Sequence, residues 1–283
     1  GRSGYTLSLT NTSDPRKTMY FPIFNWPRID NPKLSFPITE SVLEAVIQKE
    51  HHSMTQIKSA ILDHPNDIAA IIIEPIQGEA GVVVPDNGYL AGIRNLCDQY
   101  NVLFIADEVQ TGIARTGKLL AFDHEGVKPD VLILGKAISG GVFPVSAVLA
   151  NDDIMLCIKP GEHGSTFGGN PIACKVAMAA LQVVTDEALA ERAEKLGQLL
   201  RDELRKIDSE MITLVRGKGL LNAIVIKPVS GKEAWDVCVA LKENGLLAKP
   251  THGDIIRFAP PLIITKEQLM ECISIIKKTI LSF

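Results

Sequence analysis

Val102-Leu-Phe-Ile-Ala-Asp-Glu-Val-Gln110 is the stretch that decides the fold. An unbroken apolar run opens it, and an acidic pair follows. Similar runs occupy 68–73, 131–134 and 146–150. Because they show no polar alternation, we expect strands buried on both faces. A helical pattern at 89–100 separates the first two strands, and this strand-helix-strand order predicts a parallel α/β sheet.

Caps and chain breakers predict the remaining elements. Residues 1–38 are rich in proline and poor in periodic apolar positions, so we expect irregular structure there. Thr39 begins a helix that ends before Pro65, and Asn170-Pro171 begins another. Later segments comprise a helix at 189–204, strands at 213–225 and 246–258, and a helix from the capping box Thr265-Lys-Glu-Gln268 to Leu281. We therefore predict a large domain over 1–187 and a smaller α+β domain over 188–283.

Composition excludes several classes of protein. The 283 residues are 46% hydrophobic and 22% charged, with a net charge of -4, which disfavours nucleic acid as a partner. No apolar run reaches the roughly 18 residues of a membrane span. The five cysteines form no metal-binding spacing, so we expect reduced thiols and no metal. The chain starts with Gly and shows no signal segment, so we expect a truncated chain or a fragment. With reduced thiols, we expect the cytoplasm as its location, or alternatively the mitochondrial matrix.

Polar side chains follow three of the predicted strands. Glu74, Asp107 and Lys136 come directly after or near the carboxyl ends, where sheets of this class bind ligands. Lys136 lies in a glycine-rich turn and could form a Schiff base, or it could be a phosphate-binding or surface lysine. Asp107 could pair with a pyridinium nitrogen, or it could cap a helix. Gln110 could donate to a ring hydroxyl, and together these residues suit pyridoxal 5'-phosphate.

Several motifs carry a family resemblance. Residues 71–79 (IIIEPIQGE), 104–112 (FIADEVQTG), 134–141 (LGKAISGG) and 161–170 (GEHGSTFGGN) resemble the class III aminotransferases of fold type I. From about residue 68 onward the sequence is most similar to ornithine aminotransferases, whereas 1–50 resembles lysine 6-aminotransferases. The resemblance implies a mainly parallel, seven-stranded type of sheet flanked by helices, with a smaller C-terminal domain.

The resemblance also implies roles for residues that bind the cofactor. Lys136 would form the Schiff base and transfer the proton, Asp107 would bind the pyridine nitrogen, and Gln110 would bind the ring oxygen. Ser165 and Thr166 would contribute to the phosphate site of a neighbouring subunit, so we expect a homodimer or a higher oligomer. The alternative for Ser165 and Thr166 is a plain turn.

Three charged residues are assigned to substrate binding. Arg257 lies in an apolar strand and needs a carboxylate partner. In the family it would bind 2-oxoglutarate, and Glu79 matches a glutamate that masks this arginine while the amino donor reacts. The alternative is a permanent structural ion pair. Arg2 matches an arginine that holds the donor's α-carboxylate, or it is a surface residue near the chain start.

The expected reaction is transfer of the terminal amino group of ornithine to 2-oxoglutarate, giving glutamate and glutamate semialdehyde, which cyclises to pyrroline carboxylate. Lysine 6-, acetylornithine and 4-aminobutyrate aminotransferases are alternatives. A non-catalytic fragment or partner subunit is an alternative of another class. In the family, an N-terminal part that this sequence lacks supplies a glycine-rich segment that binds the cofactor phosphate. Without that segment we expect the chain to bind the cofactor weakly. A nucleotide-binding module is disfavoured because no strand precedes a glycine fingerprint.

Overall fold

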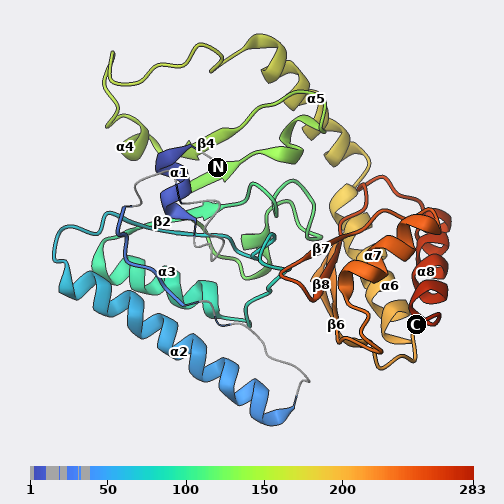
Figure 1. Ribbon diagram of the computed structural model, residues 1–283. Helices are drawn as coiled ribbons and strands as arrows, with labels where there is room; N and C mark the ends of the chain where they lie inside the picture. The colour runs from blue at the N-terminus through green and yellow to red at the C-terminus, as the bar shows by residue number, and fades with distance from the viewer. Residues whose placement is uncertain (1–2, 11–18, 20–23, 31, 33–38) are drawn as a thin grey trace.

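The computed structural model describes residues 3–10, 19, 24–30, 32 and 39–283. Two β-sheets, each covered by helices, organise this part of the chain (Figure 1). The first sheet belongs to the N-terminal half, and the second lies beside it among the C-terminal helices. The α/β class predicted from the sequence is confirmed.

The first sheet has the strand order β1-β2-β3-β4. Strands β1 (Ala70–Ile73), β2 (Leu103–Asp107) and β3 (Val131–Leu134) are parallel, and β4 (Ala147–Ala150) is antiparallel to β3. Parallel pairing requires a long crossover, but β3 and β4 are joined only through the short 3-10 turn η3 (Lys136–Ser139) and a loop.

Two expectations for this sheet were wrong. In the described residues it has four strands rather than seven, because other apolar runs before α5, such as 119–122 and 154–158, form helix, bend or turn instead of strand. Strand β4 was expected to be buried on both faces. It is an edge strand instead, and Val148 and Leu149 are 55% and 48% exposed.

Helices α2 (Glu40–Asp63) and α3 (Tyr89–Tyr100) lie together along the first sheet (Figure 1). The Thr39 side chain caps α2 by accepting a hydrogen bond from Val42 N, as expected. Both helices contribute to one hydrophobic core with β2 and the 3-10 turn η2 (Ala121–His124), whose buried members include Ile57, Ile93, Phe104 and Phe122. This core fixes the strand that ends in Asp107.

The expectation of irregular structure before residue 39 was wrong for α1 (Gly4–Leu9). This short helix occupies a proline-free segment, and its Leu7 is buried. Tyr5, Phe24 and Trp26 pack their rings together at centroid separations of 5.5–5.9 Å. Aromatic packing therefore stabilises a helix that the sequence pattern alone did not reveal.

The C-terminal half confirms its predicted elements. Helix α5 (Pro171–Asp186) is capped by Asn170, and α6 (Leu189–Arg205) follows it. The second sheet is antiparallel with the order β5-β6-β8-β7, formed by β5 (Ile212–Lys218), β6 (Leu221–Ile226), β7 (Lys249–Thr251) and β8 (Ile255–Phe258). Its core includes apolar residues of α6, α7 (Ala234–Glu243) and α8 (Lys266–Ile280). The predicted capping box Thr265–Gln268 begins α8. The short helix α4 (Asp152–Met155) lies between β4 and α5 along the chain.

Buried contacts join the two halves. Arg115 Nη1 donates to Leu220 O at 3.1 Å and to Pro260 O at 2.6 Å. A Cβ on Gly219 would lie 2.3 Å from the carbonyl carbon of Thr116, so the two backbones touch at a position where only glycine fits. These contacts fix the loop after β2 against the second sheet.

Candidate active site

Lys136 lies two residues beyond β3 and begins η3. Its φ of +44° is in the left-handed region, which is costly for a residue with a side chain and which it shares with other non-glycine residues of the chain, among them Asn66 and Ala188. Its Nζ donates to Gln110 Oε1 at 2.5 Å. The structure thus brings together two residues that the sequence analysis assigned to one cofactor.

The environment of Lys136 lowers the pKa of its amine. Desolvation by surrounding atoms is the main cause, and the Arg257 guanidinium acts in the same direction. Glu74 and Asp107 oppose the shift. A lower pKa leaves more of the amine neutral at physiological pH, and the neutral amine is the nucleophile.

Asp107 is the last residue of β2. Its Oδ1 accepts a hydrogen bond from Val109 N at 3.1 Å, which is the kind of backbone contact that a capping aspartate makes. Its charge acts on both Lys136 and Glu74. Gln110 packs tightly at this edge, because a Cβ on Gly78 would lie 2.1 Å from Gln110 Nε2.

Glu74, directly beyond β1, was noted in the sequence but given no role. Its Oε2 accepts a hydrogen bond from Gly78 N at 3.0 Å. Burial is the main cause that raises the pKa of its carboxyl, and the charges of Asp107 and Glu79 also raise it. Its position at a strand end, shared with Asp107, was the signal that could have assigned it to the site.

Arg257 enters this region from β8 of the second sheet. Its Nη1 donates to Gly78 O at 3.1 Å, and its buried Nε has no hydrogen-bond partner among the described residues. No ion pair joins Arg257 to a carboxylate in the part of the chain that the structure describes. The guanidinium therefore retains capacity to bind an anion.

Glu79 does not pair with Arg257 in this structure. Its Oε2 lies 3.5 Å from His252 Nε2, and its backbone carbonyl accepts a hydrogen bond from Thr251 Oγ1 at 3.0 Å. His252 was missed by the sequence analysis. Its place in the turn between β7 and β8, with φ of +53°, became visible only once the hairpin was formed.

The remaining predicted residues lie elsewhere. Ser165 Oγ accepts a hydrogen bond from Gly168 N at 2.8 Å, which fits the plain-turn alternative, and both Ser165 and Thr166 are exposed. Their segment, between α4 and α5, projects away from the body of the chain (Figure 1). Arg2 lies outside the described residues.

The arrangement brings an amine, two carboxylates and an arginine to the carboxyl edge of the first sheet, which Arg257 reaches from β8. Such a set can bind a carbonyl compound covalently, hold a protonated ring and neutralise a carboxylate ligand. In the described residues no cluster of His, Cys, Asp and Glu suits a metal ion, and no helix is both long and apolar enough to span a membrane.

Comparisons with known proteins agree with this chemistry. The chain matches the family described as aminotransferase class-III over residues 1–280. It is 64% identical over 233 residues to the mitochondrial ornithine aminotransferase of Drosophila melanogaster, which covers 82% of this chain and 53% of the relative. The chain therefore spans about half the length of that relative.

Two solved structures resemble the fold. The acetylornithine aminotransferase of Elizabethkingia anophelis has a TM-score of 0.78 at 64% identity, covering 81% of this chain and 61% of that one. The ornithine aminotransferase of Toxoplasma gondii, with PLP at partial occupancy in its active site, has a TM-score of 0.86 at 42% identity, covering 100% of this chain and 62% of the other. Because the family match extends over nearly every residue, this chain belongs to the class-III aminotransferase family.

Proposed function

We propose that this chain carries the catalytic lysine of a pyridoxal-phosphate-dependent enzyme that transfers the terminal amino group of ornithine to 2-oxoglutarate. The observation that carries the proposal is the Lys136 amine, which donates a hydrogen bond to Gln110 and on which the charges of Asp107 and Arg257 act. The identity of 64% to an ornithine aminotransferase supports the choice of donor. The products would be glutamate and glutamate semialdehyde, which cyclises to pyrroline carboxylate.

The described residues fit the cofactor. Lys136 Nζ would bond the aldehyde carbon, Asp107 would face the ring nitrogen, and Gln110, already 2.5 Å from Nζ, would bind the ring oxygen. When bound, pyridoxal phosphate supplies an electron sink next to the carbon that loses its proton. Lys136 Nζ would take up that proton and return it, because desolvation favours its neutral form.

Arg257 would bind the carboxylate of 2-oxoglutarate. Its buried Nε without a partner supports this role, since a carboxylate could accept from two guanidinium nitrogens at once. Glu79 would cover Arg257 while ornithine reacts, which requires its side chain to leave His252. Arg2 would hold the α-carboxylate of the donor.

A second donor has direct support, because the Elizabethkingia anophelis relative, also 64% identical, is an acetylornithine aminotransferase. Lysine is a third candidate, through the similarity of residues 1–50 to lysine 6-aminotransferases. A panel of ornithine, acetylornithine and lysine, each with 2-oxoglutarate, separates these functions. It should be run on this chain and on the chain extended with the N-terminal part of the Drosophila melanogaster relative. A higher rate with acetylornithine or lysine than with ornithine overturns the proposed donor.

We also propose a homodimer, with a large cofactor-binding domain over 1–187 and a small domain over 188–283. Large apolar side chains are exposed from η3 to α5, including Val142 (76%), Phe167 (73%), Ile172 (64%) and Met178 (61%), which suits a partner surface. Ser165 and Thr166 would then reach the partner's cofactor phosphate. A mitochondrial or cytoplasmic location is proposed from the Drosophila melanogaster relative and from the reduced cysteines.

Covalent trapping tests the assignment of Lys136 as the residue that bonds the cofactor, and the substrate panel separates an active subunit from a non-catalytic fragment. The chain is incubated with pyridoxal phosphate, reduced with borohydride, digested and analysed by mass spectrometry. Label should concentrate on Lys136, vanish from that site in Lys136→Ala and be unchanged in the control Lys58→Ala. Equal labelling of Lys136 and Lys58 would refute a specific cofactor site.

A further inference from the structure

A groove lined by many charged side chains lies at the junction of the two halves, outside the cluster around Lys136. Its volume is about 690 Å³, and α6, β5 and the loop that precedes η2 line it. Five cationic side chains and only two anionic ones, Glu191 and Glu194, face it; the cations are Lys118, Lys195, Arg201, Arg205 and Lys218. This excess is local, because the whole chain carries a net charge of -4.

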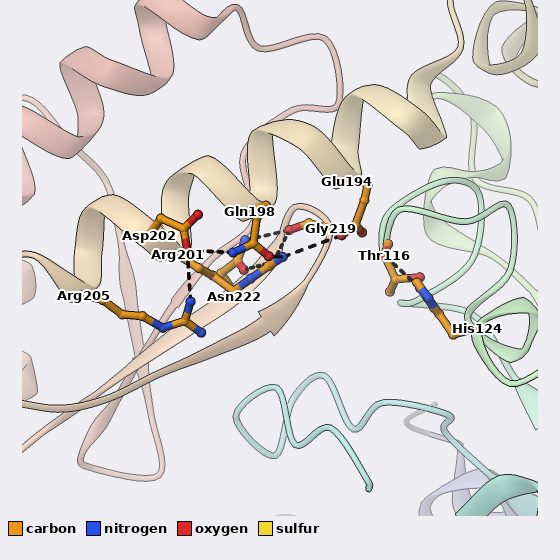
Figure 2. Close-up of polar contacts among 9 residues, drawn as sticks. All are labelled: Thr116, His124, Glu194, Gln198, Arg201, Asp202, Arg205, Gly219 and Asn222. Atoms are coloured by element: carbon orange, nitrogen blue, oxygen red, sulfur yellow. Dashed lines mark hydrogen bonds and ion pairs between the residues drawn. The ribbon is translucent and has the colours of Figure 1, made fainter. Parts of the chain in front are cut away.

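The two arginines already have partners within the chain. Arg201, only 5% exposed, donates to Gly219 O at 3.1 Å, Asn222 Oδ1 at 2.9 Å and Gln198 Oε1 at 2.9 Å. Arg205 pairs with Asp202 at 3.2 Å. Figure 2 shows Gln198, Arg201, Asp202 and Arg205 along α6, Gly219 and Asn222 on the neighbouring β5–β6 hairpin, and Thr116 and His124 on a separate segment near Glu194. The arginines therefore form part of the groove wall rather than its free binding groups.

The three lysines are differently placed. No ion pair involves Lys118, Lys195 or Lys218 within the described part of the chain. Burial, followed by the charge of Lys218, lowers the pKa of His124, and Lys118 contributes in the same direction. The charge of Glu194 opposes them. Lys118 and Lys218 line the same groove as His124, so an anion in the groove would be attracted by both.

The groove walls are held firmly. A Cβ on Gly117 would lie 2.2 Å from Glu194 Oε2, and one on Gly197 would lie 1.7 Å from Gly219 O. The loop that carries Lys118, the helix that carries Lys195 and the strand that carries Lys218 are thus in direct contact. Their lysines converge from three separate segments, which a single exposed helix face could not provide.

We propose that this groove binds a small polyanion with at least two phosphate groups, held by Lys118, Lys195 and Lys218. Ammonium groups are compact point charges that bind phosphate oxygens without demanding one planar geometry. A ligand bound here bridges the loop after β2 and the second sheet, and junctions between structural units are frequent ligand sites. This site is independent of the proposed aminotransferase function.

Titration calorimetry at low ionic strength, with inorganic pyrophosphate as the probe, tests the proposal. The variant K118Q/K195Q/K218Q should bind about tenfold more weakly, because each exposed charge contributes about twofold. The control K58Q/K227Q/K242Q removes the same charge elsewhere and should retain the affinity. Glu191→Gln removes a repulsive charge from the groove and should tighten binding about twofold.

Equal losses in the two triple variants would mean an adventitious ion only and would overturn the proposal. So would loss of binding in Lys136→Ala, which would place the phosphate at the other site. Binding of orthophosphate as tight as that of pyrophosphate would overturn the requirement for two phosphates. ADP as a second probe shows which kind of molecule carries the phosphates. If ADP and pyrophosphate bind with equal affinity, the groove recognises phosphates alone; if ADP binds more tightly, it recognises a nucleotide. Both results support the site.

Discussion

Replacing Gly197 by alanine should destabilise the chain because α6 touches the second sheet at that residue. The new Cβ would lie 1.7 Å from Gly219 O and 2.2 Å from its carbonyl carbon. That separation is about 1.8 Å short of ordinary contact. Both atoms belong to backbone, so relief requires α6 or the turn between β5 and β6 to move.

The magnitude follows from what such a movement breaks. Overpacking costs about 1–3 kcal/mol. Gly219 O accepts hydrogen bonds from Arg201 Nη1 at 3.1 Å and from Asn222 Nδ2 at 2.9 Å, and weakening both costs about 2 kcal/mol more. The higher helix propensity of alanine raises the free energy of unfolding by about 1 kcal/mol. The expected net loss in the free energy of unfolding is about 3 kcal/mol.

Urea unfolding followed by circular dichroism measures this loss, with Gly92→Ala as the matched control. Gly92 also lies within a helix, α3, but its Cβ would meet only the mobile end of Met54, at 2.2 Å from Cε. That side chain can rotate away, so the control should change stability by less than about 1 kcal/mol. Equal stability of the two variants would refute the reasoning from backbone contact.

Three further predictions follow from buried polar groups. Arg115→Met should lower the free energy of unfolding by about 2 kcal/mol in the same assay, because the carbonyls of Leu220 and Pro260 lose their shared donor; an unchanged midpoint would contradict this. Burial raises the pKa of the Glu108 carboxyl in the folded chain. Above the unfolded-state pKa of about 4.3, ionisation therefore lowers the free energy of unfolding, and the stability of wild type relative to Glu108→Gln should fall as pH rises. A stability difference that stays constant with pH would be inconsistent with this. Burial raises the pKa of Cys97 to about 11, so iodoacetamide at pH 8 should label exposed Cys157 and spare Cys97 in the native chain, and comparable labelling by mass spectrometry would count against it.

Local pattern was sufficient to predict most of the fold. The caps at Thr39, Asn170 and Thr265 and the apolar runs that became β1 to β3 lie where the sequence indicated. The antiparallel direction of β4 was not visible, because an apolar run carries no information on strand direction. Its exposed face was also missed, since burial depends on which elements cover the sheet.

The clustering of the candidate residues was predictable where they follow strand ends. Lys136 and Gln110 are in contact, and Asp107 acts electrostatically on Lys136, because parallel strands bring their carboxyl ends to one edge. The position of the Glu79 side chain was not predictable, since its partner His252 comes from a hairpin far along the chain. Contacts of this range depend on how the two sheets pack, which no local motif records.

The double hydrogen bond of Arg115 limits how the protein can be dissected for expression. A fragment beginning at α6 would lack Arg115, which donates to two carbonyls of that fragment, and it would expose the surface on which Gly219 rests. Truncation designed from the sheet boundaries alone would therefore yield an aggregation-prone product. Isotope-labelled samples for spectroscopy are better prepared from the intact polypeptide.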